Sequence, residues 1–140
     1  MNKIFVDTGA FFSLQAEDDR HHREAKDIFP TLLTSCRNLA TSNLVLAETY
    51  TLLRMTKSFA TAWKFLEIIE GSPRIEVLFS TKAIEEEALK ILSRFSDHAF
   101  SFVDGTSFAI MKRERISHAF AFDVHFKIAG VLRIPQDHKV

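Results

Sequence analysis

The chain contains a single cysteine, Cys36, and no second cysteine that could pair with it. An internal disulfide and a thiolate metal site are therefore excluded, which favours a reducing compartment. Asp7 interrupts the first apolar residues before they reach signal-peptide length, and no later run approaches the roughly 18 apolar residues of a membrane span. We expect a cytoplasmic protein with no membrane partner.

Glycine and proline are also scarce, at 4 and 3 residues, and neither sign of charge is in excess. Lysine plus arginine and aspartate plus glutamate each total 18, which excludes a strong basic field over the whole surface. The 140 residues, 46% of them hydrophobic, suit one ordered domain. A domain of this length buries roughly 68–70% of its unfolded surface. We predict a single domain over residues 1–140, in which any contact with nucleic acid is local.

Short apolar runs alternate with segments of helical periodicity. Strands are predicted at 4–6, 38–41, 75–79, 118–122 and 131–134. Helices are predicted from about residue 10 and at 21–36, 43–57, 59–70, 82–95 and 101–115, with Pro30 expected to kink or divide the second of them. This alternation predicts an α/β fold: a three-layer α/β/α domain with a mainly parallel central sheet of about five strands.

Two aspartates directly follow predicted strands, Asp7 after 4–6 and Asp123 after 119–122. Ligands bind beyond the carboxyl ends of the strands in parallel α/β sheets, so both residues are expected at that edge. Each aspartate also has a local structural explanation, because Asp7 suits a helix N-cap and Asp123 suits a turn after a strand.

Glu48 lies at helical spacing from Val45, Leu52 and Met55, which predicts that it faces inward. A carboxylate in such a position needs a partner. Either a lysine or arginine in a structural ion pair or a bound metal ion would satisfy it.

Asp104 follows Ser101 by three residues, the spacing of a capping box at a helix start. If these four acids converge, their charges repel one another unless they are protonated or bridged by cations. The chain offers no thiolate set and no His-x-x-x-His pair, so the expected metal is Mg²⁺ or Mn²⁺. Such ions activate water and bind phosphate, which indicates phosphodiester hydrolysis.

The acids and their neighbours form four segments: FVDTGAF at 5–11, TSNLVLAET at 41–49, SFVDGTSF at 101–108 and AFDVHF at 121–126. In this order they resemble the PIN-domain nuclease family, including the VapC-like ribonuclease toxins. The resemblance covers nearly the whole chain and implies a PIN-like domain that cleaves RNA. It also implies that Asp7, Glu48 and Asp104 bind Mg²⁺ or Mn²⁺ and that Asp123 assists them. A small antitoxin protein and a homodimer are the partners that it suggests.

Three neighbours of these acids are further candidates for contacts with water, metal or substrate. Thr8 resembles the hydroxyl residue that often follows the first acid of the family, whereas Gly9 departs from the commoner Ser or Asn. Ser107 either bonds the backbone carbonyl four residues earlier or contacts a ligand. His125 either packs locally or contacts phosphate and assists proton transfer.

Basic and aromatic residues give weaker indications of function. The basic residues at 20, 23, 26, 112, 113 and 115 are interpreted as solvated helix faces, with guidance of an RNA backbone as the alternative. Most of the 14 phenylalanines are expected in the core. Trp63 shares an apolar stripe with Phe59 and Leu66, which favours core or dimer packing.

Two other activities fit part of the pattern. Asp7 after a strand suits a phosphotransferase that forms a phosphoaspartate, but Gly9 stands where phosphatases similar to haloacid dehalogenases have a second aspartate. The other alternative is a catalytically weak PIN-like module that binds RNA or a protein, although the presence of all four acids favours activity. A toxin and an RNA-processing enzyme are both compatible with the sequence.

Overall fold

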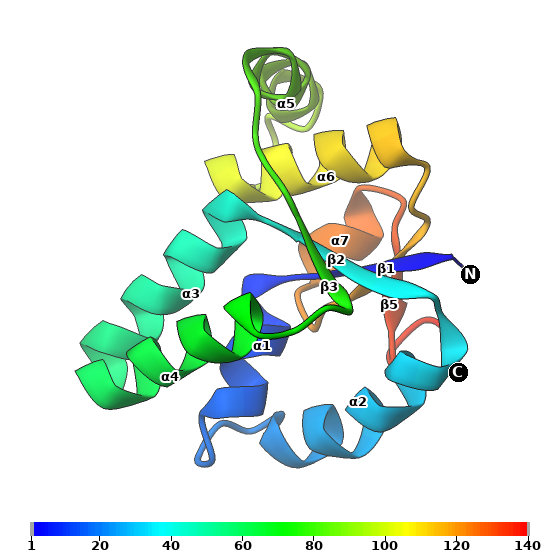
Figure 1. The fold of residues 1–140 in the computed structure, drawn as a ribbon. Helices are drawn as coiled ribbons and strands as arrows, with labels where there is room; N and C mark the ends of the chain where they lie inside the picture. Colours follow the sequence, from blue (N-terminus) through cyan, green and yellow to red (C-terminus); the bar gives the residue numbers. More distant parts are fainter. Residues whose placement is uncertain (1, 140) are drawn as a thin grey trace.

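The computed structural model describes residues 2–139, and its five strands form one parallel sheet in the order β3-β2-β1-β4-β5 (Figure 1). The strands are β1 (Lys3–Val6), β2 (Asn38–Ser42), β3 (Ile75–Leu78), β4 (His118–Phe120) and β5 (Leu132–Ile134). β1 is central, with Phe5 opposite Ala40 of β2 on one side and Ala119 of β4 on the other. The predicted parallel sheet of about five strands is confirmed.

Helices connect the strands and cover both faces of the sheet. They are α1 (Thr8–Gln15), α2 (His22–Ser35), α3 (Asn43–Thr56), α4 (Phe59–Glu70), α5 (Lys82–Arg94), α6 (Phe102–Glu114) and α7 (Val124–Ile128). On one side, α1 packs against α2 and α3, and α3 packs against α4; on the other, α6 contacts α5 and α7 (Figure 1). The three-layer α/β/α architecture therefore agrees with the prediction.

Hydroxyl side chains begin several of these helices. Ser42 and Ser101 accept the backbone N–H groups of Val45 and Asp104, which satisfies donors that the first helical turn leaves without partners. Thr81 caps α5 in the same way. These caps fix where α3 and α6 start, and both starts lie near the carboxyl edge of the sheet.

The structure differs from the predicted elements in three places. α2 runs as one helix through Pro30, where the proline is exposed while Ala25 and Leu32 on the opposite stripe are buried. β4 ends at Phe120 instead of residue 122, and the Phe122 carbonyl accepts a hydrogen bond from the Arg133 guanidinium at 3.1 Å. The short helix α7 was not predicted, because five residues are too few for a periodic pattern.

Most of the 14 phenylalanines lie in the core or pack against it, as predicted. The buried ones are Phe5, Phe11, Phe65, Phe108, Phe120 and Phe126, and the partly buried ones packed against the core are Phe12, Phe29, Phe95, Phe100 and Phe122. The prediction for Trp63 is wrong with respect to the core, because its side chain is 51% exposed and stacks on the exposed Phe59.

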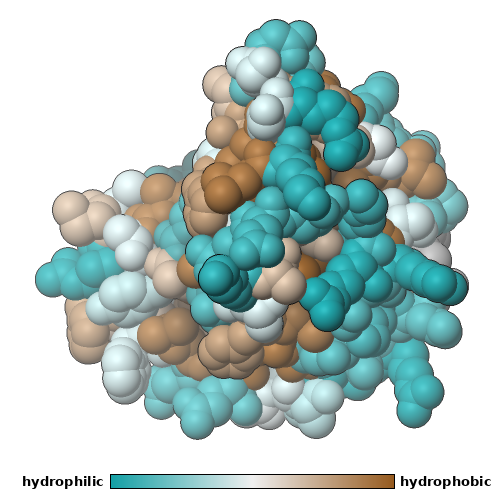
Figure 2. Space-filling model, turned by 90° about the horizontal axis from the view of Figure 1, so that it is seen from above, coloured by the Kyte–Doolittle hydropathy of each residue, from teal (hydrophilic) through white to brown (hydrophobic). Residues whose placement is uncertain are grey.

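Hydrophilic residues interrupt hydrophobic ones across the side that carries α5 (Figure 2). Among residues 2–139, no helix has the length and apolar character needed to cross a membrane.

Candidate metal centre

β1 and β4 are neighbours in the sheet, but the chain continues from β1 to β2 on one side and from β4 to β5 on the other. The candidate site lies at this switch point. Such a switch point is where open α/β sheets bind ligands. Asp7 directly follows β1, and its backbone N–H donates to the Phe120 carbonyl of β4 at 3.1 Å. Asp123 follows β4 after two residues. The topology thus brings the first and last of the predicted acids to the same end of the sheet, beside the switch point between β1 and β4. We call this region around the four acids the crevice.

Asp7 is buried, at 6% exposure, and its carboxylate is not used as a helix cap. It occupies the N-cap position of α1, yet its side chain makes no capping hydrogen bond. Burial raises the pKa of Asp7 from its ordinary value of 3.8 to about 7, and the negative charges of Asp104, Glu48 and Asp123 add to the effect. A hydrogen bond with the Thr8 backbone opposes the shift. The other three acids therefore each act electrostatically on Asp7.

Asp104 forms the predicted capping box at the start of α6. Its backbone N–H donates to Ser101 Oγ at 3.0 Å, and its Oδ2 accepts the Ser101 N–H at 2.9 Å. The box leaves Oδ1 without a hydrogen bond from any of the described residues. Capping and ligand binding are consequently compatible, because the cap orients the carboxylate and occupies only one of its oxygens.

Asp123 caps α7 through Oδ1, which accepts the His125 N–H at 2.8 Å. This turn brings the His125 ring over the acids: Nδ1 lies 3.3 Å from Asp104 Oδ2 and 3.5 Å from Asp123 Oδ1. One donor atom from each of these three residues lies within 4.8 Å of the other two. This trio has the geometry to hold a metal ion.

Glu48 does not lie on the inward stripe predicted for it. The buried side of α3 is formed by Val45, Thr49 and Leu53, whereas Glu48, Leu52 and Met55 are exposed. The buried residues of α3 are spaced four apart. Leu52 and Met55 are apolar but exposed, so the sequence pattern points to the wrong side of the helix. No lysine or arginine among residues 2–139 pairs with Glu48, so the structural ion pair considered as its alternative is absent there. Its carboxylate remains open to solvent and raises the pKa of Asp7.

Two hydroxyls near the acids are buried without a hydrogen-bond partner in the described part of the chain, Thr8 Oγ1 and Ser107 Oγ. The backbone bond considered for Ser107 is not formed; the Val103 carbonyl instead accepts the hydroxyl of Thr106. A Cβ added at Gly9 would lie 3.8 Å from Asp7 Oδ2, an ordinary contact. Steric fit therefore does not require the glycine beside the first acid.

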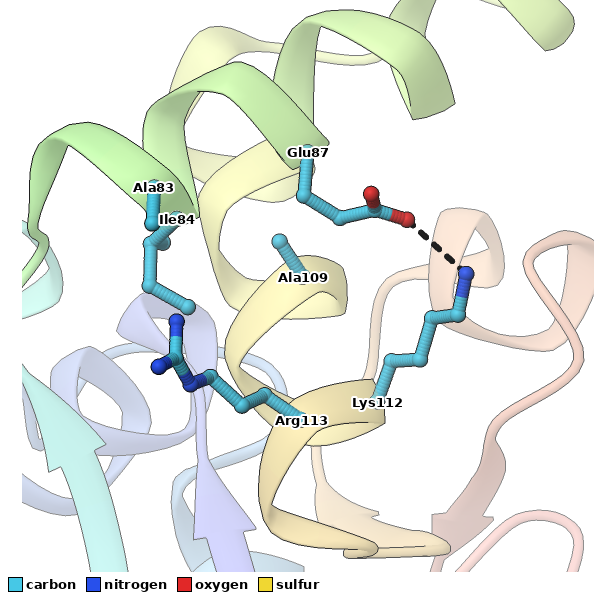
Figure 3. Close-up of a pocket in the computed structure, with 6 residues that line it drawn as sticks. All are labelled: Ala83, Ile84, Glu87, Ala109, Lys112 and Arg113. Atoms are coloured by element: carbon cyan, nitrogen blue, oxygen red, sulfur yellow. Dashed lines mark hydrogen bonds and ion pairs between the residues drawn. The ribbon is translucent and has the colours of Figure 1, made fainter.

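A separate hollow lies between α5 and α6, lined by Ala83, Ile84, Glu87, Ala109, Lys112 and Arg113 (Figure 3). Its one carboxylate, Glu87, already accepts a hydrogen bond from Lys112 at 2.8 Å. That bond lowers the pKa of Glu87. Asp7 differs, because no lysine or arginine of residues 2–139 forms an ion pair with it or with the three acids that raise its pKa.

A family model for the PIN domain matches residues 4–132. The chain belongs to the PIN-domain family. It is 36% identical over 135 residues to the 23S rRNA-specific endonuclease VapC20 of Mycobacterium tuberculosis, a match that covers 94% of this chain and 97% of the relative. The crystal structure of that VapC20, described as a toxin that cleaves the sarcin-ricin loop, matches with a TM-score of 0.84 over 91% of this chain and 95% of the other.

Two other solved structures share the fold at low sequence identity. VapBC2 from Rickettsia felis, bound to a DNA fragment from its promoter, matches with a TM-score of 0.72 and 13% identity over 94% of this chain and 96% of the other. A toxin-antitoxin complex from Klebsiella pneumoniae matches with a TM-score of 0.67 and 16% identity, over 91% of this chain and 94% of the other. The PIN architecture predicted from the sequence is therefore confirmed.

Proposed function

We propose that this PIN domain is a metal-dependent endoribonuclease that hydrolyses RNA phosphodiester bonds at the site formed by Asp7, Glu48, Asp104 and Asp123. The observation that carries the proposal is the buried Asp7 carboxylate, whose pKa is raised to about 7 beside three further acids. A site of this kind is stabilised by a bound cation, which neutralises the repulsion. The 36% identity to a 23S rRNA-specific endonuclease over 94% of the chain supports RNA as the substrate.

The oxygen-rich donor set suits Mg²⁺ or Mn²⁺. When bound, either ion supplies positive charge to the scissile phosphate and lowers the pKa of a coordinated water. Asp7, Glu48 and Asp104 are the proposed principal ligands, and Asp123 completes the set. The caps at Asp104 and Asp123 hold two of these carboxylates in place before substrate arrives. Preorganised charges of this kind need little rearrangement during reaction.

The remaining residues of the site have supporting roles in the proposal. Glu48 is exposed on α3, and its carboxylate is proposed to contact the ion from the solvent side. Thr8 and Ser107 offer buried hydroxyls with no partner among the described residues, and these orient water or an acid in the loaded site. The His125 imidazole lies beside both Asp104 and Asp123, with Nδ1 at 3.3 Å and 3.5 Å from their oxygens, and so faces the proposed ion.

Partners and location form the less direct part of the proposal. The structural neighbours from R. felis and K. pneumoniae come from toxin-antitoxin complexes, which supports a small antitoxin protein as the partner. We propose a cytoplasmic location, which the similarity to an endonuclease of ribosomal RNA supports. The homodimer suggested by the family resemblance stays a prediction, which light scattering of the purified chain would test.

A matched pair of variants tests the function. Glu48→Gln removes a carboxylate at the crevice, and Glu87→Gln removes one from the hollow between α5 and α6. With an RNA that contains a sarcin-ricin loop and with Mg²⁺ or Mn²⁺, we expect cleavage by the wild type and by Glu87→Gln. We expect a loss of at least about 100-fold in Glu48→Gln and complete inhibition by chelator. Equal cleavage by both variants, or cleavage that survives the chelator, would refute the proposed function.

A further inference from the structure

The metal centre contains one nitrogen donor among its oxygens. His125 Nδ1 lies 3.3 Å from Asp104 Oδ2 and 3.5 Å from Asp123 Oδ1. Adjacent ligands of an octahedral ion with bonds of about 2.1 Å lie about 3 Å apart. The two distances from Nδ1 thus approximate the spacing of neighbouring ligands on one ion. Each of the two carboxylate oxygens accepts one capping hydrogen bond and keeps a second lone pair for the ion.

A simple ion pair accounts less well for this arrangement. Charge-assisted hydrogen bonds between nitrogen and oxygen are usually about 2.7–2.9 Å long, and both His125 distances are longer. Both oxygens also have shorter contacts already, because Asp104 Oδ2 accepts the Ser101 N–H at 2.9 Å and Asp123 Oδ1 accepts the His125 backbone N–H at 2.8 Å. The imidazole nitrogen is therefore close to both carboxylates without forming a tight bond to either.

The surroundings of His125 fix its ring. The backbone of His125 is anchored by the Asp123 cap at the start of α7. The Phe100 ring packs beside the imidazole with 5.1 Å between ring centroids. Little side-chain freedom is left to lose on binding an ion, and this favours ligation. The Asp7 carboxylate, which is buried at 6% exposure and makes no capping hydrogen bond, is a separate indication that a cation belongs at this point.

We propose that His125 binds the metal through Nδ1 and thereby makes this site select Mn²⁺ over Mg²⁺. Mg²⁺ prefers oxygen ligands and retains its waters, whereas first-row transition ions accept imidazole nitrogen readily. The carboxylates keep the site hard enough for Mn²⁺, the softer of the two ions that the donor set suits. This inference rests on the proposed function, since it concerns the same site, and it names the ion and one of its ligands.

The test measures metal binding directly. Mn²⁺-loaded protein is examined by pulsed electron paramagnetic resonance, which detects ¹⁴N coordinated to the ion, and ¹⁵N labelling of histidine identifies the source. Affinities for Mn²⁺ and Mg²⁺ are measured by calorimetry. We expect a ¹⁴N signal in the wild type that is replaced by a ¹⁵N signal on labelling. In His125→Asn, which offers an amide near the former Nδ1 position, the signal should vanish.

The same variant should reduce the preference for Mn²⁺ over Mg²⁺ about 10-fold or more, the loss that altered metal-site residues commonly cause. His98→Asn is the matched control, because His98 is exposed and its Nε2 lies 3.8 Å from a single carboxylate oxygen, that of Asp97. This control should retain both the nitrogen signal and the preference. Absence of coordinated nitrogen in the wild type, or an unchanged ratio of affinities in His125→Asn, would overturn the inference.

RNA cleavage separates this inference from the proposed function. A wild type that cleaves RNA but shows no coordinated nitrogen overturns the role of His125 alone. A wild type that shows histidine nitrogen on Mn²⁺ and the expected ratio of affinities, yet cleaves no RNA, supports the metal assignment and refutes the ribonuclease. The spectrum of the wild type requires no substitution, so a folding defect in His125→Asn would leave the test decisive.

Discussion

Replacing Asp7 by asparagine should stabilise the metal-free protein. The fold holds this carboxylate at 6% exposure among three other acids, which raises its pKa from 3.8 to about 7. A shift of that size corresponds to about 4 kcal/mol of unfolding free energy lost when Asp7 is ionised. Asparagine is nearly isosteric, carries no charge and keeps an oxygen that can accept the Thr8 N–H. We expect Asp7→Asn to gain about 3–4 kcal/mol at pH 8, which raises Tm by about 10 °C.

The pH dependence identifies the cause of this gain. Because the folded pKa of Asp7 lies above its unfolded value, the folded state binds the proton more tightly. Ionisation of Asp7 therefore does not reduce the free energy of unfolding of the wild type below pH 3.8. The free energy falls as the pH rises from 3.8 to about 7, and above pH 7 the loss caused by Asp7 is complete. The advantage of Asp7→Asn should be about 1.5 kcal/mol at pH 5 and should reach its full value by pH 8.

Urea unfolding followed by circular dichroism, with chelator present at pH 5 and pH 8, measures both quantities. Addition of Mn²⁺ at pH 8 should then raise the wild-type midpoint and leave that of Asp7→Asn nearly unchanged, because ligand binding stabilises only the form that binds. A variant that is no more stable than the wild type at pH 8, or a gain of equal size at both pH values, would refute the electrostatic explanation.

Three further outcomes follow from local geometry. Asp104→Ala should cost about 1 kcal/mol more than Asp104→Asn in chemical unfolding, since only asparagine can still accept the Ser101 N–H of the capping box; equal stabilities would show that the box contributes nothing. Gly105→Ala should destabilise by about 1–3 kcal/mol, because the added Cβ would come within 2.8 Å of Leu92 on the facing helix. Gly9→Ala, its control, meets nothing closer than 3.8 Å and should be neutral or stabilise by about 0.5–1 kcal/mol; a loss comparable to that of Gly105→Ala would contradict the packing argument.

Features encoded by short stretches of sequence were predictable. The apolar runs before Asp7 and Asp123 indicated strands, and Ser101 with Asp104 indicated a capping box that the structure contains. The alternation of strands and helices then fixed the sheet as parallel, because a strand that is reached through a helical crossover runs in the same direction as the strand before it. The order of the acids indicated the PIN family without knowledge of their distances.

Features that depend on tertiary packing were not predictable. Glu48 lies on a helix with apolar residues on two sides, and the packing of α3 against α1 and α4 decides that Thr49 is buried and Glu48 is exposed. The proximity of His125 to Asp104 depends on α7, a helix too short to give a periodic signal. The raised pKa of Asp7 likewise arises from burial and from charges distant in sequence.

The central claim is that the acids of the crevice bind a divalent ion that RNA cleavage requires. The most direct test is the rate of cleavage of one RNA as a function of Mn²⁺ concentration, for the wild type and for Asp104→Asn, whose cap is preserved. We predict saturable activation of the wild type, no activity with chelator, and a rate at least about 100-fold lower in Asp104→Asn at every Mn²⁺ concentration. Equal rates in the two proteins, independent of Mn²⁺, would contradict the claim.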